Sequence, residues 1–213
     1  MQPAVAEKAR LAARWASLTG RGDDAIRCGR DLLDRWSQPH RRYHDITHLR
    51  DVLNAVDTLA AEAADSDAVR LAVWFHDAVY DGRPGDDERA SAELAAQCLR
   101  DLGLAAARVG EVIRLVLTTI NHEPASDDAN GAVMCDADLS VLGRDPDGYR
   151  TYTEAVREEY RHVPDDAFRT GRTAVLESLV ARDPIFRTVT GRALWESAAR
   201  HNLTAELAEL RSG

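Results

Sequence analysis

The spacing of apolar residues restricts this chain to helices over nearly its whole length. Apolar residues recur every three or four positions, Ala, Leu, Arg and Glu dominate, and runs of β-branched residues are short. Glycine, proline and acidic residues stand where helices would end or begin. We predict a single all-α domain over residues 1–213, a bundle of roughly ten helices: about 5–18, 23–36, 45–59, 66 to the turn at 82–85, 86–102, 105–120, 133–142, 146–162, 164–179 and 192–210.

Composition argues against several classes of protein. The 27 Lys and Arg against 36 Asp and Glu give a net charge of −9, which disfavours nucleic acid and membrane surfaces as partners. No apolar stretch approaches the length of a membrane span or a signal peptide. The three cysteines are widely separated, so we expect three reduced thiols, each packed as a small apolar group in a cytoplasmic protein. The oligomeric state stays open.

Two adjacent polar residues, His76 and Asp77, end the apolar run that begins at Leu71. Burying a carboxylate without a partner is costly, and a bound cation would remove that cost. A helix cap is the alternative explanation for this pair. Further polar residues that could complete a metal site are His44, His48, His122 and, inside the apolar stretch 133–142, Asp136 or Asp138.

Two imidazoles and two carboxylates suit a divalent ion such as Mn, Fe, Co, Ni, Zn or Mg. A water that such an ion acidifies becomes a nucleophile near neutral pH, and a carboxylate such as Asp77 could orient it. A nearby cationic histidine could protonate an oxygen leaving group. His44 would lie just before the helix that carries His48, where it could point into a cleft.

These residues resemble the ordered H…HD…D signature of the HD superfamily of metal-dependent phosphohydrolases. The resemblance implies an all-α domain in which His48, His76, Asp77 and Asp138 bind the metal. The blocks Tyr43-His44-x-x-x-His48, His76-Asp77 and Asp138-Leu139-Ser140 are also similar to those of cyclic-nucleotide phosphodiesterases. That similarity makes His44 the proton donor, and His122 the counterpart of a histidine that serves a second metal.

The chain is most similar to small stand-alone bacterial proteins described as predicted metal-dependent HD phosphohydrolases. The similarity covers about 41–160 through the motifs RxYHxxxHL, WFHDxVYD, DExxSA, DADLSxLG and YxxYxxxVRxEY. It implies hydrolysis of a small-molecule phosphate mono- or diester, nucleotides included. Ala78, Val79 and Tyr80 follow the His-Asp pair, where nucleotidase and stringent-response relatives often carry glutamate or lysine. No late glutamine is present to clamp a purine, which disfavours cyclic nucleotides.

Several alternatives remain open at this point. The chain could be a di-iron oxygenase with His122 as a ligand, or a non-catalytic module that binds a small phosphorylated ligand. Asp136 could be an outer-shell partner that holds a histidine tautomer. Glu88 could line the cleft or only begin a helix. Arg157 and Tyr160 could bind a substrate phosphate, or Arg157 could pair with a glutamate on a solvated helix.

Overall fold

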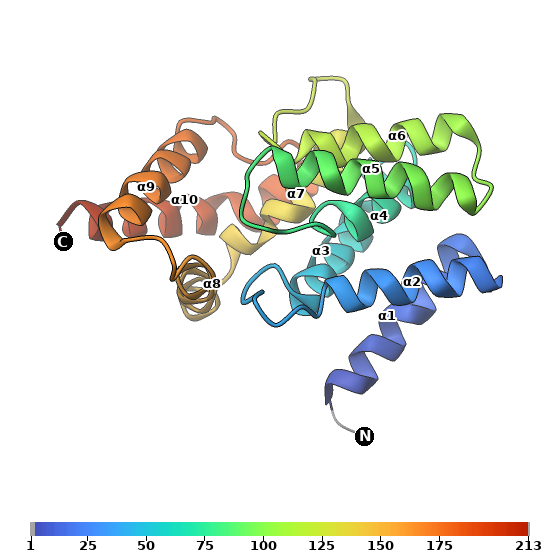
Figure 1. Cartoon of the computed structure of the whole chain (residues 1–213). Helices are drawn as coiled ribbons and strands as arrows, with labels where there is room; N and C mark the ends of the chain where they lie inside the picture. The colour runs from blue at the N-terminus through green and yellow to red at the C-terminus, as the bar shows by residue number, and fades with distance from the viewer. Residues whose placement is uncertain (1–2, 213) are drawn as a thin grey trace.

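The computed structural model describes residues 3–212, and over that range it contains helices and no strand (Figure 1). This confirms the all-α prediction with roughly ten helices. The elements are α1 (Pro3–Thr19), α2 (Asp23–Arg35), α3 (Ile46–Leu59), η1 (Ala60–Glu62), α4 (Ser66–Phe75), α5 (Asp86–Asp101), α6 (Ala106–Thr118), α7 (Ala129–Asp138), η2 (Leu139–Gly143), α8 (Pro146–Glu159), α9 (Asp165–Val180) and α10 (Val189–Ser212), where η marks a 3₁₀ helix.

Two helix ends near the predicted site differ from the expectation. Helix α4 ends at Phe75, so His76 and Asp77 leave the helix instead of continuing it toward the turn at 82–85. Helix α7 begins four residues early, because Asp128 caps it by accepting a hydrogen bond from the Gly131 amide at 2.8 Å. The polar stretch at 127–131 is therefore largely a helix start rather than a loop.

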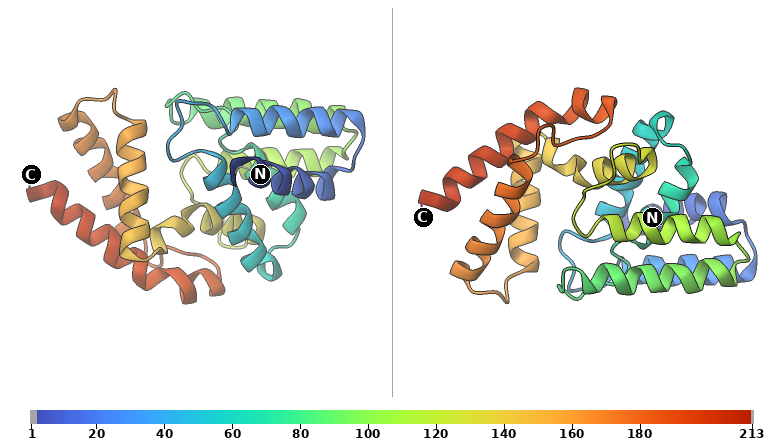
Figure 2. Two further views of the ribbon diagram at one scale, coloured as in Figure 1. Left: turned by 90° about the horizontal axis from the view of Figure 1, so that it is seen from below. Right: turned by 90° about the horizontal axis from the view of Figure 1, so that it is seen from above.

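The buried apolar side chains form two clusters. The first cluster lies among α1 to α7 and includes Trp36, Trp74 and Phe75, all with no exposed surface. The second lies among η2 and α8 to α10 and includes Phe186. Trp195 on α10 packs against both clusters. Figure 2 shows α8 to α10 grouped to one side of the other helices. The single-domain prediction is not tested by this arrangement and stays a prediction.

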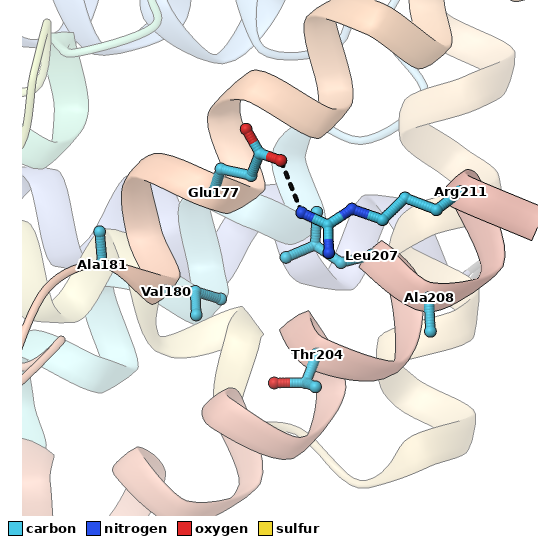
Figure 3. A pocket seen from close by; sticks show the side chains of 7 residues that line it. All are labelled: Glu177, Val180, Ala181, Thr204, Leu207, Ala208 and Arg211. Carbon is cyan, nitrogen blue, oxygen red and sulfur yellow. Dashed lines mark hydrogen bonds and ion pairs between the residues drawn. The ribbon is translucent and has the colours of Figure 1, made fainter.

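Helices α9 and α10 line an open groove of about 370 Å³ (Figure 3). Its walls are mostly small and apolar and include Val180 and Ala181 at the end of α9 and Leu207 on α10. An ion pair of 2.7 Å between Glu177 and Arg211 crosses one end. Both charged side chains are more than half exposed, so the pair contributes little to stability. None of the predicted site residues lines this groove.

The expectation of three free thiols is wrong. Cys28 on α2 and Cys98 on α5 form a disulfide, whereas Cys135 is free and buried as expected. The bonded cysteines are 70 residues apart in sequence, and only the packing of α2 near α5 brings their Cα atoms to 6.6 Å. None of the described helices has the length and apolarity needed to cross a membrane.

Candidate metal centre

Three predicted ligands meet where the ends of three helices converge. His48 lies in the first turn of α3, His76 directly follows α4, and Asp138 is the last residue of α7. Helix α7 packs against both α3 and α4, which brings these ends together. Asp45 fixes the start of α3, since its carboxylate accepts hydrogen bonds from the amides of Thr47 and His48. The predicted helix start at Asp45 is thereby confirmed.

The donor atoms of these three residues have the separations that one ion would impose. The Nε2 atoms of His48 and His76 are 3.3 Å apart. Oδ1 of Asp138 lies 3.2 Å from the first nitrogen and 3.4 Å from the second. Bonds of about 2.1 Å at angles of about 90–109° place neighbouring ligand atoms about 3.0–3.4 Å apart. This buried cluster could therefore hold a metal ion.

A backbone contact gives His76 the tautomer that a metal ligand needs. Its Nδ1 lies 2.8 Å from the carbonyl oxygen of Val73. A carbonyl can only accept, so Nδ1 carries the proton and donates it. Nε2 then faces the cluster, and its lone pair becomes available to a metal ion once the ring is neutral. Hydrogen bonds from the other ring nitrogen fix the orientation of metal-binding histidines in this way.

Asp77 lies beside the cluster, but its carboxylate is farther from the His48 nitrogen than that of Asp138 is. Its Oδ2 lies 3.2 Å from Nε2 of His76 and 3.8 Å from Nε2 of His48. The longer separation corresponds to a ligand angle of about 130° for bonds of about 2.1 Å. Among the described residues, the compact group contains His48, His76 and Asp138, with Asp77 on its flank.

The electrostatic balance of the cluster keeps its carboxylates charged. Burial alone would raise the pKa of the Asp138 carboxyl, but the charge of His76 and hydrogen bonds from His122 and His48 hold that pKa well below its usual range. The pKa of Asp77 is likewise lowered, by the charge and hydrogen bond of His76 acting against burial. These two carboxylates are largely shielded from solvent, and among the described residues their oxygens contact histidines and no Lys or Arg side chain, so they form a site suited to a cation.

His44 is held beside the cluster by a residue that the sequence did not single out. Its Nδ1 lies 2.5 Å from Oε1 of Glu159, at the end of α8. Oε2 of the same carboxylate accepts hydrogen bonds from the amides of Arg42, Tyr43 and His44. The His44 ring also stacks on Tyr80, with ring centroids 4.4 Å apart. Glu159 therefore fixes both the backbone and the ring of His44.

The negative charge of Glu159 favours the protonated form of the His44 imidazole. Burial would lower the pKa of His44, but the hydrogen bond that its ring donates to Glu159 and the charge of Asp77 outweigh burial and raise that pKa. Because the Glu159 carboxylate accepts at Nδ1, the nitrogen left to serve a reaction is Nε2. Glu159 does belong to the VRxEY motif, so the motif was a usable signal.

His122 contacts the carboxylate oxygen of Asp138 that does not face His48 and His76. Its backbone has a φ of 52°, beyond the end of α6, and its Nε2 is 2.8 Å from Oδ2 of Asp138. Arg182 fixes the segment by donating to the carbonyls of His122 and Asn121. His122 thus contacts a candidate ligand, and its role toward a second metal or a phosphate stays a prediction.

The outer-shell role predicted for Asp136 is wrong. Its carboxylate accepts hydrogen bonds from the amides of Arg187 and Thr188 and from the Thr188 hydroxyl, so it holds the segment before α10 and no histidine. Arg157 donates to the carbonyls of Tyr160 and Val163 and pairs with Asp165, so its guanidinium is engaged within its own segment and no glutamate is its partner.

A cavity of about 150 Å³ opens onto the cluster from the His44 side. Asp77, Asp138 and His122 are among its lining residues. Glu88 both lines this cavity and begins α5, where it accepts a hydrogen bond from the Gly85 amide, so both of its expected roles hold. Tyr160 is also in the lining, with its hydroxyl 3.3 Å from that of Tyr80.

The Glu159→Gln variant is expected to lose stability in a pH-dependent way. Burial would raise the Glu159 pKa, but the His44 contact and the backbone amides lower it from 4.5 to about 2. The carboxylate's stabilisation is therefore complete above about pH 4.5 and is lost as the pH falls toward 2. Urea denaturation should show a loss of about 1–3 kcal/mol at pH 7 that shrinks as the pH falls to 3.

Glu158→Gln is the matched control, because Glu158 is adjacent and half exposed. It should change the free energy of unfolding by less than about 0.5 kcal/mol. Equal losses in the two variants, or a Glu159→Gln loss that stays constant from pH 7 to pH 3, would contradict the assigned role.

Comparisons with known proteins assign no family to the chain. No protein-family model matches it, and no curated protein matches it. The likeness to the HD superfamily thus rests on the sequence motifs alone.

Proposed function

We propose that this protein is a metal-dependent phosphohydrolase, as the HD-type motifs imply. The observation that carries the proposal is that one cavity is lined both by candidate metal ligands and by His44. The Nδ1 atom of His44 is held by a hydrogen bond to Glu159. An ion site and an oriented proton donor in a common cavity are the two components that hydrolysis of a phosphate ester requires.

The residues fit a single divalent ion of the Mn, Fe, Co, Ni, Zn or Mg type. His48, His76 and Asp138 would hold it, with Asp77 as a further ligand. When bound, the ion supplies Lewis acidity, which lowers the pKa of water and neutralises charge on a phosphoryl group. Nitrogen and oxygen donors together favour the borderline ions of this set.

The chain's own residues supply the proton transfers. Asp77 is ionised and can accept a hydrogen bond from a water that approaches phosphorus. As the phosphorus–oxygen bond of the ester breaks, protonated His44 gives its Nε2 proton to the leaving oxygen. Glu159 stabilises the imidazolium before the transfer and keeps the ring in place throughout. Water and ester are thus converted to phosphate and an alcohol.

The size of the cavity favours a small ester. Its volume of about 150 Å³ lies below the about 300–1,000 Å³ typical of pockets that enclose drug-sized ligands. A whole nucleotide would have to extend out of the cavity. Small sugar or polyol phosphates fit the cavity better than nucleotides do.

A di-iron oxygenase is the second candidate. Oδ1 of Asp138 faces the histidine cluster while its Oδ2 contacts His122, so this carboxylate could bridge two ions. That function requires His122 as a ligand and two irons per chain. It predicts no release of phosphate.

The deciding experiment combines metal quantification with a phosphate-release screen. Protein purified without chelator is analysed for bound metals, then reloaded with each divalent ion and tested on nucleotides, sugar phosphates and polyol phosphates. One ion per chain with turnover supports the proposal. Two irons without phosphate release support the oxygenase, and tight ligand binding without turnover for any metal indicates a binding module.

A further inference from the structure

We propose that Arg83 binds a second anionic group of the substrate, so that the enzyme prefers phosphate esters that carry a further phosphate or carboxylate. This inference rests on the proposed function and names the substrate class of that same site. It starts from Arg83 at the cavity beside the metal cluster, where it is the sole Lys or Arg among the described lining residues.

The other titratable groups that line this cavity already have hydrogen-bond or ion-pair partners within the protein. Asp77 and Asp138 belong to the metal cluster, and His44 and His122 each contact a carboxylate. Oδ2 of Asp87 accepts hydrogen bonds from the backbone amides of Asp81 and Arg83. Oε2 of Glu88 accepts a hydrogen bond from the backbone amide of Gly85. The protein as a whole carries a net charge of −9, so an anionic substrate needs a local cation besides the metal.

The backbone around Arg83 is held by the carboxylate of Asp87. Asp87 is 5% exposed, and its bonds to the amides of Asp81 and Arg83 measure 2.9 and 2.8 Å. Gly82 and Gly85 flank Arg83 with φ values of 74° and 85°, the left-handed conformation that glycine adopts without strain. A buried carboxylate and two glycines thus shape this turn and place Arg83 at the cavity.

The Arg83 side chain itself is free to change partners. Its guanidinium pairs with Asp81 at 2.7 Å, and both side chains are more than half exposed. Exposed ion pairs of this kind contribute little, so a ligand anion can replace Asp81. A guanidinium also binds carboxylate and phosphate through two parallel hydrogen bonds, which the ammonium of lysine cannot do.

The test compares two phosphonates that differ by one carboxylate. Calorimetry on metal-loaded protein measures the affinity for methylphosphonate and for phosphonoacetate, and metal content is checked after each titration. We expect the wild type to bind phosphonoacetate more tightly. Arg83→Ala should weaken phosphonoacetate binding about tenfold and methylphosphonate binding less than about twofold, with Arg83→Lys in between.

Arg89→Ala is the matched control. Arg89 is equally exposed, pairs with Asp86 on the same helix and is absent from the cavity lining. It should leave both affinities unchanged. Equal affinity of the wild type for the two phosphonates, no binding of either, or equal effects of Arg83→Ala on both overturns the inference.

The binding readout separates this inference from the proposed function. If no phosphate ester is hydrolysed but Arg83→Ala selectively removes the phosphonoacetate preference, the anion subsite stands and the hydrolase assignment fails. If esters are hydrolysed and the Arg83→Ala variant shows no selective loss, the hydrolase stands and the subsite fails.

Discussion

Asp138→Asn is expected to remove the bound metal ion and to lower phosphate-ester hydrolysis by about 10³-fold or more. Oδ1 of Asp138 lies within 3.4 Å of the Nε2 atoms of both His48 and His76, so it is the carboxylate common to the whole cluster. Asparagine keeps the shape of the side chain but lacks the charge that offsets the cation. Metal quantification after gel filtration and a phosphate-release assay measure both effects.

Asp136→Asn is the matched control, because Asp136 is a buried aspartate on the same helix. Its carboxylate holds the amides of Arg187 and Thr188, so the variant should lose about 1–3 kcal/mol of stability but retain its metal. Full metal content in Asp138→Asn, or equal metal loss in both variants, would show that the cluster is not the metal site.

His44→Gln is expected to lower kcat by about 10²–10⁴-fold for alkyl phosphate esters while leaving metal content unchanged. The loss should be much smaller for nitrophenyl phosphate, because nitrophenolate leaves without help from an acid. A proton donor produces this dependence on the leaving group, and a residue that only supports the fold does not. Steady-state kinetics with the two ester types test it.

His201→Gln serves as the control for His44→Gln, since His201 is exposed on α10 and outside the cavity lining. It should change neither kcat nor metal content. If His44→Gln slows both ester types equally, or loses its metal, His44 is a structural residue and not the acid.

The helices were predictable because their determinants are local. Apolar spacing and capping residues such as Asp45 and Asp145 act within one or two turns, and both cap their helices in the structure. The helix end after Phe75 was missed, because no glycine or proline stands between it and Gly82. The early start of α7 was missed because the polar residues around Asp128 are equally typical of a loop.

Residues far apart in the sequence were harder to assign. Glu159 contacts His44 across 115 positions, and the Cys28–Cys98 bond spans 70, so only tertiary packing reveals either. Asp136 and Asp138 share one apolar stretch, and the sequence motif favoured Asp138 for the cluster. Side chains two positions apart on a helix point in directions about 200° apart. Asp138 therefore reaches the histidines, whereas Asp136 reaches the segment before α10.

The residues of the proposed reaction stand on helices from both apolar clusters. The candidate metal ligands stand on helices of the first cluster, whereas the carboxylate that aligns His44 stands on α8, whose buried residues belong to the second. In the proposed reaction, a change in the packing of α8 would therefore disturb the alignment of His44, while the candidate metal ligands stand on other helices.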